Sequence, residues 1–333
     1  MDSDTVVSLP EAIERFVENG ATVALEGFSH LIPFAAGHEI IRQGISGLTF
    51  CRLTPDLLSD MMIAADCVDR LVCSFFASGS AGSLYEVRRR IESADPRPLA
   101  VDEHSHHAMT LRYHAGAARL PFAPIASFVG SDIPGINPDI RSVVDPYSGS
   151  KTYVVPPLNP DVTIIHAQRA DRHGNVQIWG ITGTQQEAVY AADHVIVTVE
   201  EIVDDKVVRS DPNRTLIPAH AVDAVCEVRT GAHPSYVQGS YDRDNAFYRE
   251  WTAISKDPVK LQEWLDAHVR GTRDHADYLD SIGHDRLRGL LVDPRPSGAV
   301  DYGRRAQQGT AQGPAQQGAA QLGRARLGEG SLK

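Results

Sequence analysis

Carboxylates and histidines suited to acid–base chemistry gather in one stretch of the chain, Asp102-Glu103-His104-Ser105-His106-His107. The stretch follows a brief apolar strand predicted over residues 99–101 and precedes a helix predicted over residues 108–119. Three histidines and two carboxylates at a strand end can be metal ligands, acid/base groups or a hydrogen-bonded helix cap. A zinc site is the weakest interpretation, because adjacent histidines point to different sides and no distant Cys/His pair completes a ligand set. We therefore expect no metal.

A second candidate for chemistry is the sharp turn Glu26-Gly27-Phe28-Ser29, which ends an apolar strand predicted over residues 22–25. A helix predicted over residues 33–43 follows the turn. Open α/β proteins present backbone amides to a ligand beyond the carboxyl end of a strand in this way. The turn is therefore a candidate binding site, although any strand–helix unit contains such a turn.

A third turn, made of small residues, follows the strand predicted over residues 70–76. Its sequence is Ala77-Ser78-Gly79-Ser80-Ala81-Gly82-Ser83, and it leads into a helix predicted over residues 84–91. The amides of a Gly/Ser turn could hold an anionic or pantetheine-like group. The segment is equally consistent with a simple tight turn.

The elements that position these turns alternate between strands and helices, which is typical of an α/β fold with an open, mostly parallel sheet flanked by helices. The strand predicted over residues 162–166 is apolar, as expected for burial on both faces, and residues 194–199 form the clearest strand. Residues 245–279 are helical in pattern. Residues 133–160 are rich in Pro, Gly, Asn and Ser, with a hairpin indicated near residues 147–150, and their length favours a lid or a partner-facing loop.

The composition excludes several classes of protein. The formal net charge is −11, which argues against nucleic acid as a partner, because nucleic-acid binders gather Lys and Arg against the phosphates. No apolar run approaches the roughly 18 to 20 residues that cross a bilayer. The acidic amino terminus lacks the features of a signal peptide, so we expect a cytoplasmic protein. The four cysteines form no CxxC pair and are expected to be reduced, buried thiols.

The composition changes near residue 294. Residues 294–333 are almost free of large apolar side chains and are rich in Gln, Gly and Ala. Such a segment cannot bury enough surface to offset the entropy lost on ordering. The sequence therefore predicts one folded domain over residues 1–293 and a disordered tail over residues 294–333.

The turn after the first strand also carries a family resemblance. The chain resembles the alpha (A) subunits of class I coenzyme A transferases, especially the glutaconate-type branch, over roughly residues 8–290. Glu26 departs from that family's signature, since it replaces the first glycine of a Gly-Gly-Phe sequence. From Phe28 to its proline, the turn is also one residue shorter than in that family, and it lacks the second glycine that the family has in the turn. The residues that match the signature are Asn19-Gly20, Val23-Ala24-Leu25, Gly27-Phe28 and Pro33.

The resemblance implies an enzyme subunit with an open α/β fold. Enzymes of this family move CoA from an acyl-CoA to a carboxylic acid through a glutamate nucleophile, which becomes an acyl anhydride and then a CoA thioester. In the beta subunit that glutamate lies in a Ser-Glu-Asn-Gly motif, and this sequence contains no such motif. The resemblance therefore implies a separately encoded beta subunit in an α2β2 hetero-oligomer, with a CoA thioester as substrate and no permanently bound cofactor.

The resemblance also implies roles for individual residues. Glu26 would be hydrogen-bonded within the site or turned to the subunit interface, since an unpaired buried carboxylate is costly, but it would not replace the missing nucleophile. Ser78 and Gly79 would line the CoA side or the acyl side of the site. The amides that would donate to the substrate or to an oxyanion are those of Gly27, Phe28 and Ser29.

Two alternatives remain open under this resemblance. A related branch, the steroid-ring-opening hydrolases of actinobacteria, keeps the fold and uses water in place of an acceptor carboxylate. For that chemistry Glu103 would be a general base, oriented by a histidine such as His106. In the other alternative the chain is a catalytically silent partner that only completes the fold and site of its beta partner. A purely structural interpretation has Glu103 and His106 capping the following helix and hydrogen-bonding each other.

Overall fold

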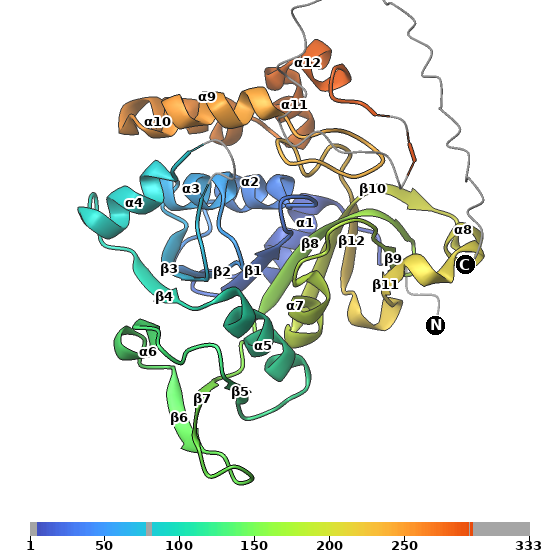
Figure 1. Ribbon diagram of the computed structural model, residues 1–333. Coiled ribbons are helices and arrows are strands. Elements are labelled where there is room, and N and C mark those ends of the chain that lie inside the picture. The colour runs from blue at the N-terminus through green and yellow to red at the C-terminus, as the bar shows by residue number, and fades with distance from the viewer. Residues whose placement is uncertain (1–4, 78–81, 293, 296–333) are drawn as a thin grey trace, which may run out of the picture.

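The computed structural model describes residues 5–77, 82–292 and 294–295. Within them, seven parallel strands form one open sheet in the spatial order β12-β10-β8-β1-β2-β3-β4 (Figure 1). Two short strands, β9 and β11, extend one end of β8 in antiparallel fashion. The predicted open, mostly parallel sheet is confirmed. The strands are β1 (Thr22–Glu26), β2 (Leu48–Cys51), β3 (Val68–Cys73), β4 (Ala100–Glu103), β8 (Val162–Asp171), β9 (Val176–Gln177), β10 (His194–Val203), β11 (Thr215–Ile217) and β12 (Ala224–Glu227).

Strand β1 lies where the order of the strands reverses. The chain proceeds outward from β1 through β2, β3 and β4, and then crosses back to β8 on the other side of β1 before continuing to β10 and β12. In open α/β sheets, ligands bind beyond the carboxyl ends of the strands that flank such a reversal. The turn after β1 therefore occupies the position where a ligand is expected.

Helices cover both faces of the sheet. Side chains alternate between the faces along a strand, so Val23 and Leu25 pack with α1, α2 and α3, whereas Ala24 packs with α5 and α7. Figure 1 shows α1–α3 on one side of the sheet and α5 and α7 on the other. Glu26 follows Ala24 by two residues, so its side chain points toward α5. The helices are α1 (Leu9–Phe16), α2 (Phe34–Arg42), α3 (Leu57–Ala64), α4 (Tyr85–Glu92), α5 (His106–Ala117), α7 (Gln185–Ala191) and α8 (Asp205–Ser210), with 3-10 turns at Pro212–Arg214 and Ala219–Ala221.

A further layer of helices covers the outer side of α2 and α3 (Figure 1). The rings of Phe247 and Trp251 stack, and Trp264 packs edge-on against both. These aromatic contacts join two of the helices to each other, and the helical pattern predicted over residues 245–279 is confirmed. The layer consists of α9 (Asn245–Ser255), α10 (Pro258–Leu265), a π-helical turn (Asp266–Arg270), α11 (His275–Ile282) and α12 (His284–Arg288).

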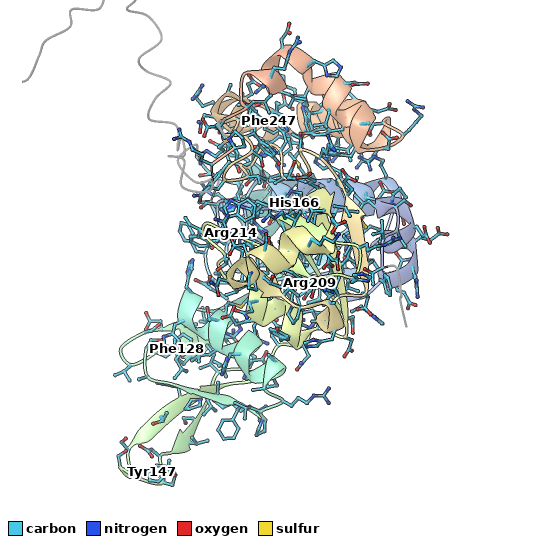
Figure 2. All side chains as sticks on the ribbon, turned by 90° about the vertical axis from the view of Figure 1, so that its right-hand side faces the viewer. Phe128, Tyr147, His166, Arg209, Arg214 and Phe247 are labelled. Atoms are coloured by element: carbon cyan, nitrogen blue, oxygen red, sulfur yellow. The ribbon has the colours of Figure 1, made fainter. Side chains whose placement is uncertain are left out.

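A small antiparallel sheet projects from the body of the molecule beside α5. It has the strand order β5-β7-β6, and Figure 2 shows Tyr147 at its far end. We call residues 120–158 the arm. The hairpin expected near residues 147–150 is present, and the segment expected to be a lid or a partner-facing loop is a folded sheet whose apolar cluster is shared with α5. Its role as a lid or as a partner-facing segment stays a prediction. The elements of the arm are β5 (Ala123–Ile125), α6 (Ile133–Ile136), β6 (Arg141–Val144) and β7 (Lys151–Val155).

Several element boundaries differ from the sequence-based expectations for local physical reasons. Helix α5 begins at His106 because the Ser105 hydroxyl accepts from Ala108 N at 3.1 Å and caps the helix. Strand β10 continues past Val199 to Val203, where it pairs with the long strand β8.

The remaining expectations concern features away from the strand ends. All four cysteines are buried and unpaired, as predicted. No described helix is long and apolar enough to cross a bilayer. Most of the predicted tail, residues 296–333, lies outside the described residues, so its disorder and the boundary at residue 294 stay predictions.

Candidate active site

The carboxylate of Glu26 is buried at the end of β1. Its Oε1 accepts hydrogen bonds from Leu53 N at 2.9 Å and from Tyr113 OH at 2.9 Å. Leu53 follows β2, and Tyr113 lies on α5, so the carboxylate connects three elements around the turn. Of the two sequence-based expectations for Glu26, the hydrogen-bonded one agrees with this geometry.

Burial raises the pKa of the Glu26 carboxyl from 4.5 to about 7, although the nearby Arg52 cation and the hydrogen bonds from Tyr113 and Leu53 favour the charged form. The loss of solvent and the same carboxylate raise the pKa of the Tyr113 phenol well above its ordinary value. Glu26 can therefore gain or lose a proton near neutral pH, while Tyr113 remains a donor.

A fully buried arginine, Arg52, braces the turn from the β2 side. Its guanidinium donates to Leu25 O at 2.5 Å and to Gly27 O at 3.1 Å, and it forms an ion pair with Asp56 Oδ2 at 3.3 Å. Asp56 in turn caps α3 by accepting from Leu58 N at 3.2 Å. Sequence reasoning missed Arg52. The available signal was a cation directly after an apolar strand, followed four residues later by a helix-capping carboxylate.

The turn after β1 is held in a tight conformation. A Cβ atom at Gly27 would lie 2.4 Å from Leu31 O, so only glycine fits there. Ser29 and Leu31 both adopt positive φ, at 61° and 55°. Among the described residues, no acceptor receives a hydrogen bond from the backbone N–H of Phe28 or Ser29. These two amides are free donors at a fixed strand end.

Phe28 lies between two segments that are distant in the sequence. A Cβ at Gly183, which has φ of 58°, would lie 2.8 Å from Phe28 Cβ, so the loop before α7 approaches Phe28 closely because it lacks a side chain. On its other side, the Phe28 ring meets the His106 ring edge-on with the centroids 6.1 Å apart. Phe28 and His106, singled out separately in the sequence, therefore lie together.

His106 is the first residue of α5, and both of its ring nitrogens are engaged. Nε2 lies 3.1 Å from Thr54 Oγ1, and Nδ1 lies 3.2 Å from Ser74 Oγ. Ser74 donates its single hydroxyl proton to Leu53 O at 2.5 Å, so it must accept from His106 Nδ1–H. This assigns the Nδ1–H tautomer to the neutral ring and orients Nε2 toward Thr54.

Glu103 is exposed at the end of β4, the edge strand, and its side chain borders a hollow of about 240 Å³. No hydrogen bond among the described residues joins Glu103 to His106, and Ser105, not either of these residues, caps α5. The intervening His104 is buried, with Nε2 2.6 Å from Arg112 Nη1, and burial lowers its pKa to about 3. The histidine nearest to Glu103 in sequence is thus a neutral structural group.

Two candidate residues cannot be placed. Ser78 and Gly79 lie outside the described residues, so their proposed contact with CoA or the acyl group stays a prediction. No group of three or more His, Cys, Asp or Glu side chains suited to a metal ion occurs within the ranges that the structure describes.

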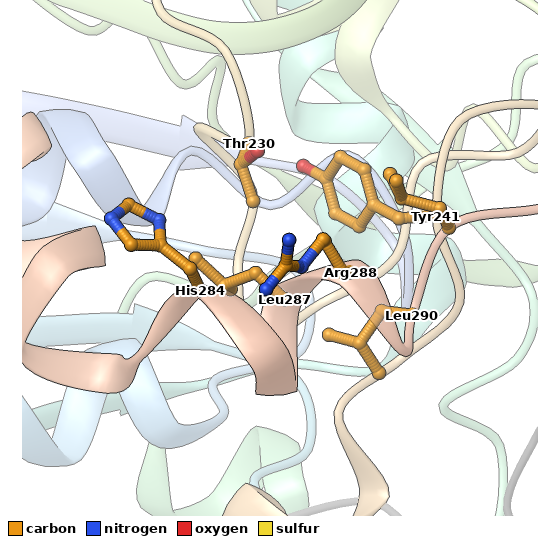
Figure 3. Close-up of a pocket in the computed structure, with 7 residues that line it drawn as sticks. Thr230, Tyr241, His284, Leu287, Arg288 and Leu290 are labelled. Carbon is orange, nitrogen blue, oxygen red and sulfur yellow. The ribbon is translucent and has the colours of Figure 1, made fainter.

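A second polar cluster surrounds Glu200 in β10, which is separated from β1 by strand β8. Glu200 in β10 accepts from His166 Nε2 at 2.8 Å, from Tyr241 OH at 2.8 Å and from Thr230 N at 2.7 Å. Figure 3 shows Thr230 and Tyr241 facing a cavity of about 260 Å³ whose other walls come mainly from α12 and the residues after it. Every donor around Glu200 is used inside the protein, which is typical of a structural cluster.

The chemistry available at the end of β1 follows from these contacts. Two free amides can bind an oxyanion, an aromatic ring and an imidazole can flank an acyl chain, and a buried carboxylate can hold a proton. The carboxylate of Glu26 is enclosed by its own hydrogen bonds and is not presented as a nucleophile. The described residues of this site therefore supply binding groups without an exposed carboxylate at the turn.

Comparison with known proteins places the chain in a family. The family model described as "Coenzyme A transferase" matches residues 6–228. The chain is 47% identical to the A subunit of the 3-oxoadipate CoA-transferase from Pseudomonas knackmussii over 281 residues, which covers 84% of this chain and 99% of that protein. It is 29% identical to a cholesterol ring-cleaving hydrolase subunit of Rhodococcus jostii, over 81% of this chain and 94% of that one.

The fold agrees with this placement. The crystal structure of glutaconate coenzyme A-transferase from Acidaminococcus fermentans superimposes with a TM-score of 0.83 at 32% identity, covering 87% of this chain and 96% of that one. The family model spans most of the described sheet, and the relatives are matched over almost their whole length. The chain therefore belongs to the coenzyme A transferase family, as an A-type (alpha) subunit of its class I enzymes.

Proposed function

We propose that this chain is one half of a two-subunit CoA transferase, which moves CoA from an acyl-CoA to a carboxylic acid with a glutamate nucleophile supplied by a separately encoded B subunit. The observation that carries the proposal is the pair of unpaired amides, Phe28 N–H and Ser29 N–H, at the end of β1 where the strand order reverses. They provide oxyanion donors, while the only carboxylate of the turn, Glu26, is enclosed. A nucleophile from another chain completes such a site.

The acceptor is proposed to be a short dicarboxylic acid. The relative at 47% identity is named for 3-oxoadipate, and the superimposed crystal structure is named for glutaconate, and both acids carry two carboxylates. The higher identity favours 3-oxoadipate as the first acid to test. His106 is proposed to lie beside the acyl chain, since Thr54 and Ser74 fix its ring next to Phe28.

The reaction proceeds by two exchanges at one glutamate. The partner's carboxylate attacks the thioester carbonyl and expels the CoA thiolate, which leaves an acyl glutamyl anhydride. The thiolate then attacks the glutamyl carbonyl, releasing the first carboxylic acid and forming a glutamyl CoA thioester. The acceptor carboxylate reverses these two steps and leaves as its CoA thioester. Each attack creates an oxyanion, and the Phe28 and Ser29 amides are proposed to stabilise the one on the acyl group.

Reconstitution tests this proposal. The chain alone should transfer no CoA, and the chain combined with its B subunit should transfer it. The kcat/KM for 3-oxoadipate should exceed that for 3-oxohexanoate, which lacks only the second carboxylate, by at least about 100-fold, the scale of one lost charged hydrogen bond. Full transfer by the isolated chain would overturn the proposal, and equal use of the two acids would overturn the dicarboxylate assignment.

Hydrolysis, either of a CoA thioester or of a ring in a CoA-linked substrate, is the second candidate function. It is favoured by the similarity to one chain of a ring-cleaving hydrolase and by Glu103, an exposed carboxylate beside a hollow, which could activate water as a general base. Release of free CoA without any acceptor acid, lost in a Glu103→Gln variant, would support this function over transfer.

A silent structural role makes a different prediction. If the chain only completes the fold of its partner, Glu103→Gln and His106→Gln should both leave the kinetics of the complex unchanged. A change in kcat/KM for either variant, with the complex still assembled, would exclude that role.

A further inference from the structure

The arm carries an unpaired strand edge. Strand β6 lies at the border of the β5-β7-β6 sheet, and all four of its residues are exposed. Such an edge offers a row of backbone donors and acceptors to another strand, and proteins usually block it unless it is used. Proline, bulges and lysine are absent from Arg141-Ser142-Val143-Val144, and Arg141 is the one charged side chain of this short strand.

Exposed apolar side chains are concentrated on the same arm. In the part of the chain that the structure describes, four large apolar side chains are more than 70% exposed, and all four belong to the arm. A concentration of this kind marks an interaction surface. The four are Val129 (77%), Ile136 (71%), Val144 (72%) and Tyr147 (98%).

The hydrogen-bond phase of β6 determines which residues could pair with a second strand. Asp145 N donates to Ser150 O at 2.9 Å across the hairpin, so the backbone of residue 145 faces β7. Because the direction alternates along an antiparallel strand, the backbones of Val143 and Arg141 also face β7. The N–H and C=O groups of Ser142 and Val144 therefore point outward from the free edge.

A second copy of the same strand fits this edge in one favourable register. Antiparallel pairing around Val143 places Ser142 opposite Val144 of the other copy, so the outward donors and acceptors of the two strands meet. The same register places Arg141 opposite Asp145 of the other copy, twice by symmetry. No ion pair of Arg141 occurs among the described residues, so the pairing would give its charge a partner.

We infer that β6 is the contact through which two copies of this chain associate, by antiparallel pairing about a two-fold axis at Val143. The interface joins the two three-stranded arms into one six-stranded sheet and covers part of the exposed apolar surface. It is independent of the proposed reaction, since the arm's free edge lies on β6 and the candidate site lies at the end of β1. In a complex with the B subunit, it would join two A–B pairs.

Cysteine cross-linking tests the register directly. In the complex, Val143→Cys places two thiols at a non-hydrogen-bonded pair, where Cα atoms lie about 4.5 Å apart, within disulfide reach. The matched control is Val144→Cys, which would lie diagonally from its own copy at about 7–8 Å. The native cysteines are buried and give little background. Under mild oxidation, Cys at 143 should yield a disulfide-linked pair of this chain, and Cys at 144 should yield little.

The outcomes separate the possible neighbours of β6. If the arms meet only by random collision, the more exposed residue 144 should cross-link at least as fast as residue 143, which would overturn the inference. If the B subunit covers β6, neither variant should cross-link two copies of this chain, and adding B should protect both thiols from alkylation, which would also overturn it.

A second variant tests the contact by mass. Ser142→Pro removes one outward N–H from the free edge without removing a hydrogen bond to β7. In sedimentation at micromolar concentration, the A–B complex with Ser142→Pro should have half the mass of the native complex. Its circular dichroism spectrum should be unchanged. Ser148→Pro, in the hairpin tip beyond β6, is the control and should leave the mass unchanged. An unchanged mass for Ser142→Pro would overturn the inference.

Discussion

Glu26 at the end of β1 and Glu200 in β10 are both largely buried carboxylates that accept from a tyrosine, yet their surroundings differ. Glu200 receives donors on both oxygens, from His166 and Tyr241 on Oε1 and from Thr230 on Oε2. Leu53 and Tyr113 both donate to the same oxygen of Glu26, and burial raises its pKa to about 7. The donors around Glu200 are all used within the protein, whereas the turn after Glu26 also carries free amides.

A buried carboxylate beside a histidine or tyrosine therefore does not by itself identify an active site. What distinguishes the two regions is the presence of donors that the protein itself does not use. At Glu200 every donor around the carboxylate has a partner, which stabilises the fold. At the end of β1, no acceptor among the described residues pairs with the Phe28 and Ser29 amides, which we propose to bind the substrate.

Removal of Arg52 should have the largest effect on the β1 region. Arg52→Met leaves the carbonyls of Leu25 and Gly27 and the carboxylate of Asp56 without their buried cation, so the free energy of unfolding should fall by about 3–5 kcal/mol. Urea unfolding measures this loss. The control is Arg70→Met, whose exposed ion pair with Asp102 is worth less than about 1 kcal/mol. Equal losses in the two variants would contradict the role of Arg52.

Glu200→Ala tests whether the Glu200 cluster is structural. His166, Tyr241 and Thr230 N would lose a common acceptor, so the free energy of unfolding should fall by about 3 kcal/mol, while kcat/KM of the folded complex changes less than about twofold. Glu201→Ala, at the exposed neighbour, is the control and should change stability by less than about 0.5 kcal/mol. A large loss of activity without loss of stability would show that the Glu200 cluster is not merely structural.

The pH dependence of stability tests the protonation of Glu26. Its pKa is about 7 in the folded state against 4.5 ordinarily, so the folded chain binds the extra proton between these values. That stabilisation is complete below about pH 4.5 and is lost as the pH rises through 7. Glu26→Gln cannot bind the proton. As the pH rises from 5 to 8, the free energy of unfolding of the variant should therefore increase by about 2 kcal/mol relative to that of the native chain.

Comparing the native chain with the Glu26→Gln variant also separates the effect of Glu26 on stability from that of the buried histidines. Burial lowers the pKa of His30 and of His104 to about 3, so both destabilise the fold as the pH falls below about 6.5. These contributions are the same in native chain and variant and cancel in the difference. A difference that does not change with pH would mean that Glu26 is ionised throughout.

His106→Gln should have the smallest effect of the series. The imidazole fixed by Thr54 and Ser74 flanks Phe28, so its loss should lower kcat/KM of the complex by about 10-fold, equivalent to about 1.4 kcal/mol, with little change in stability. His107→Gln, the exposed neighbour on the same helix turn, is the control and should act like the native chain. Equal kinetics for the two variants would remove His106 from the site.

Much of the fold follows from local sequence patterns. The apolar strand before Glu26 and the strands predicted over residues 162–166 and 194–199 all have strong local signals, and the structure has each of them. The arm was harder to predict, because all four residues of β6 are exposed and the strand lacks the alternation of a half-buried strand. Its turn-forming residues indicated a loop with a hairpin, and only the contact with β7 makes it a sheet.

The site was predictable only in part, because its contacts join residues far apart in the chain. Gly27, Phe28 and Ser29 were predicted as site residues from a strand-end turn, and His106 from its polar neighbourhood, and their roles stay predictions. Arg52 was missed because its partners, Leu25 O and Gly27 O, are backbone atoms of another strand and leave no pattern in the sequence. For the same reason, nothing in the sequence separated the enclosed Glu26 from the exposed Glu103.

The central claim is that this chain supplies groups that bind the substrate, whereas the nucleophilic glutamate comes from the B subunit. Its most direct test is to incubate the reconstituted complex with acyl-CoA, reduce the trapped thioester with borohydride, and locate the modified glutamate by mass spectrometry. We predict that the reduced residue lies in the B subunit, while peptides containing Glu26 and Glu103 remain unmodified. A reduced residue at Glu26 or Glu103 of this chain would contradict the claim.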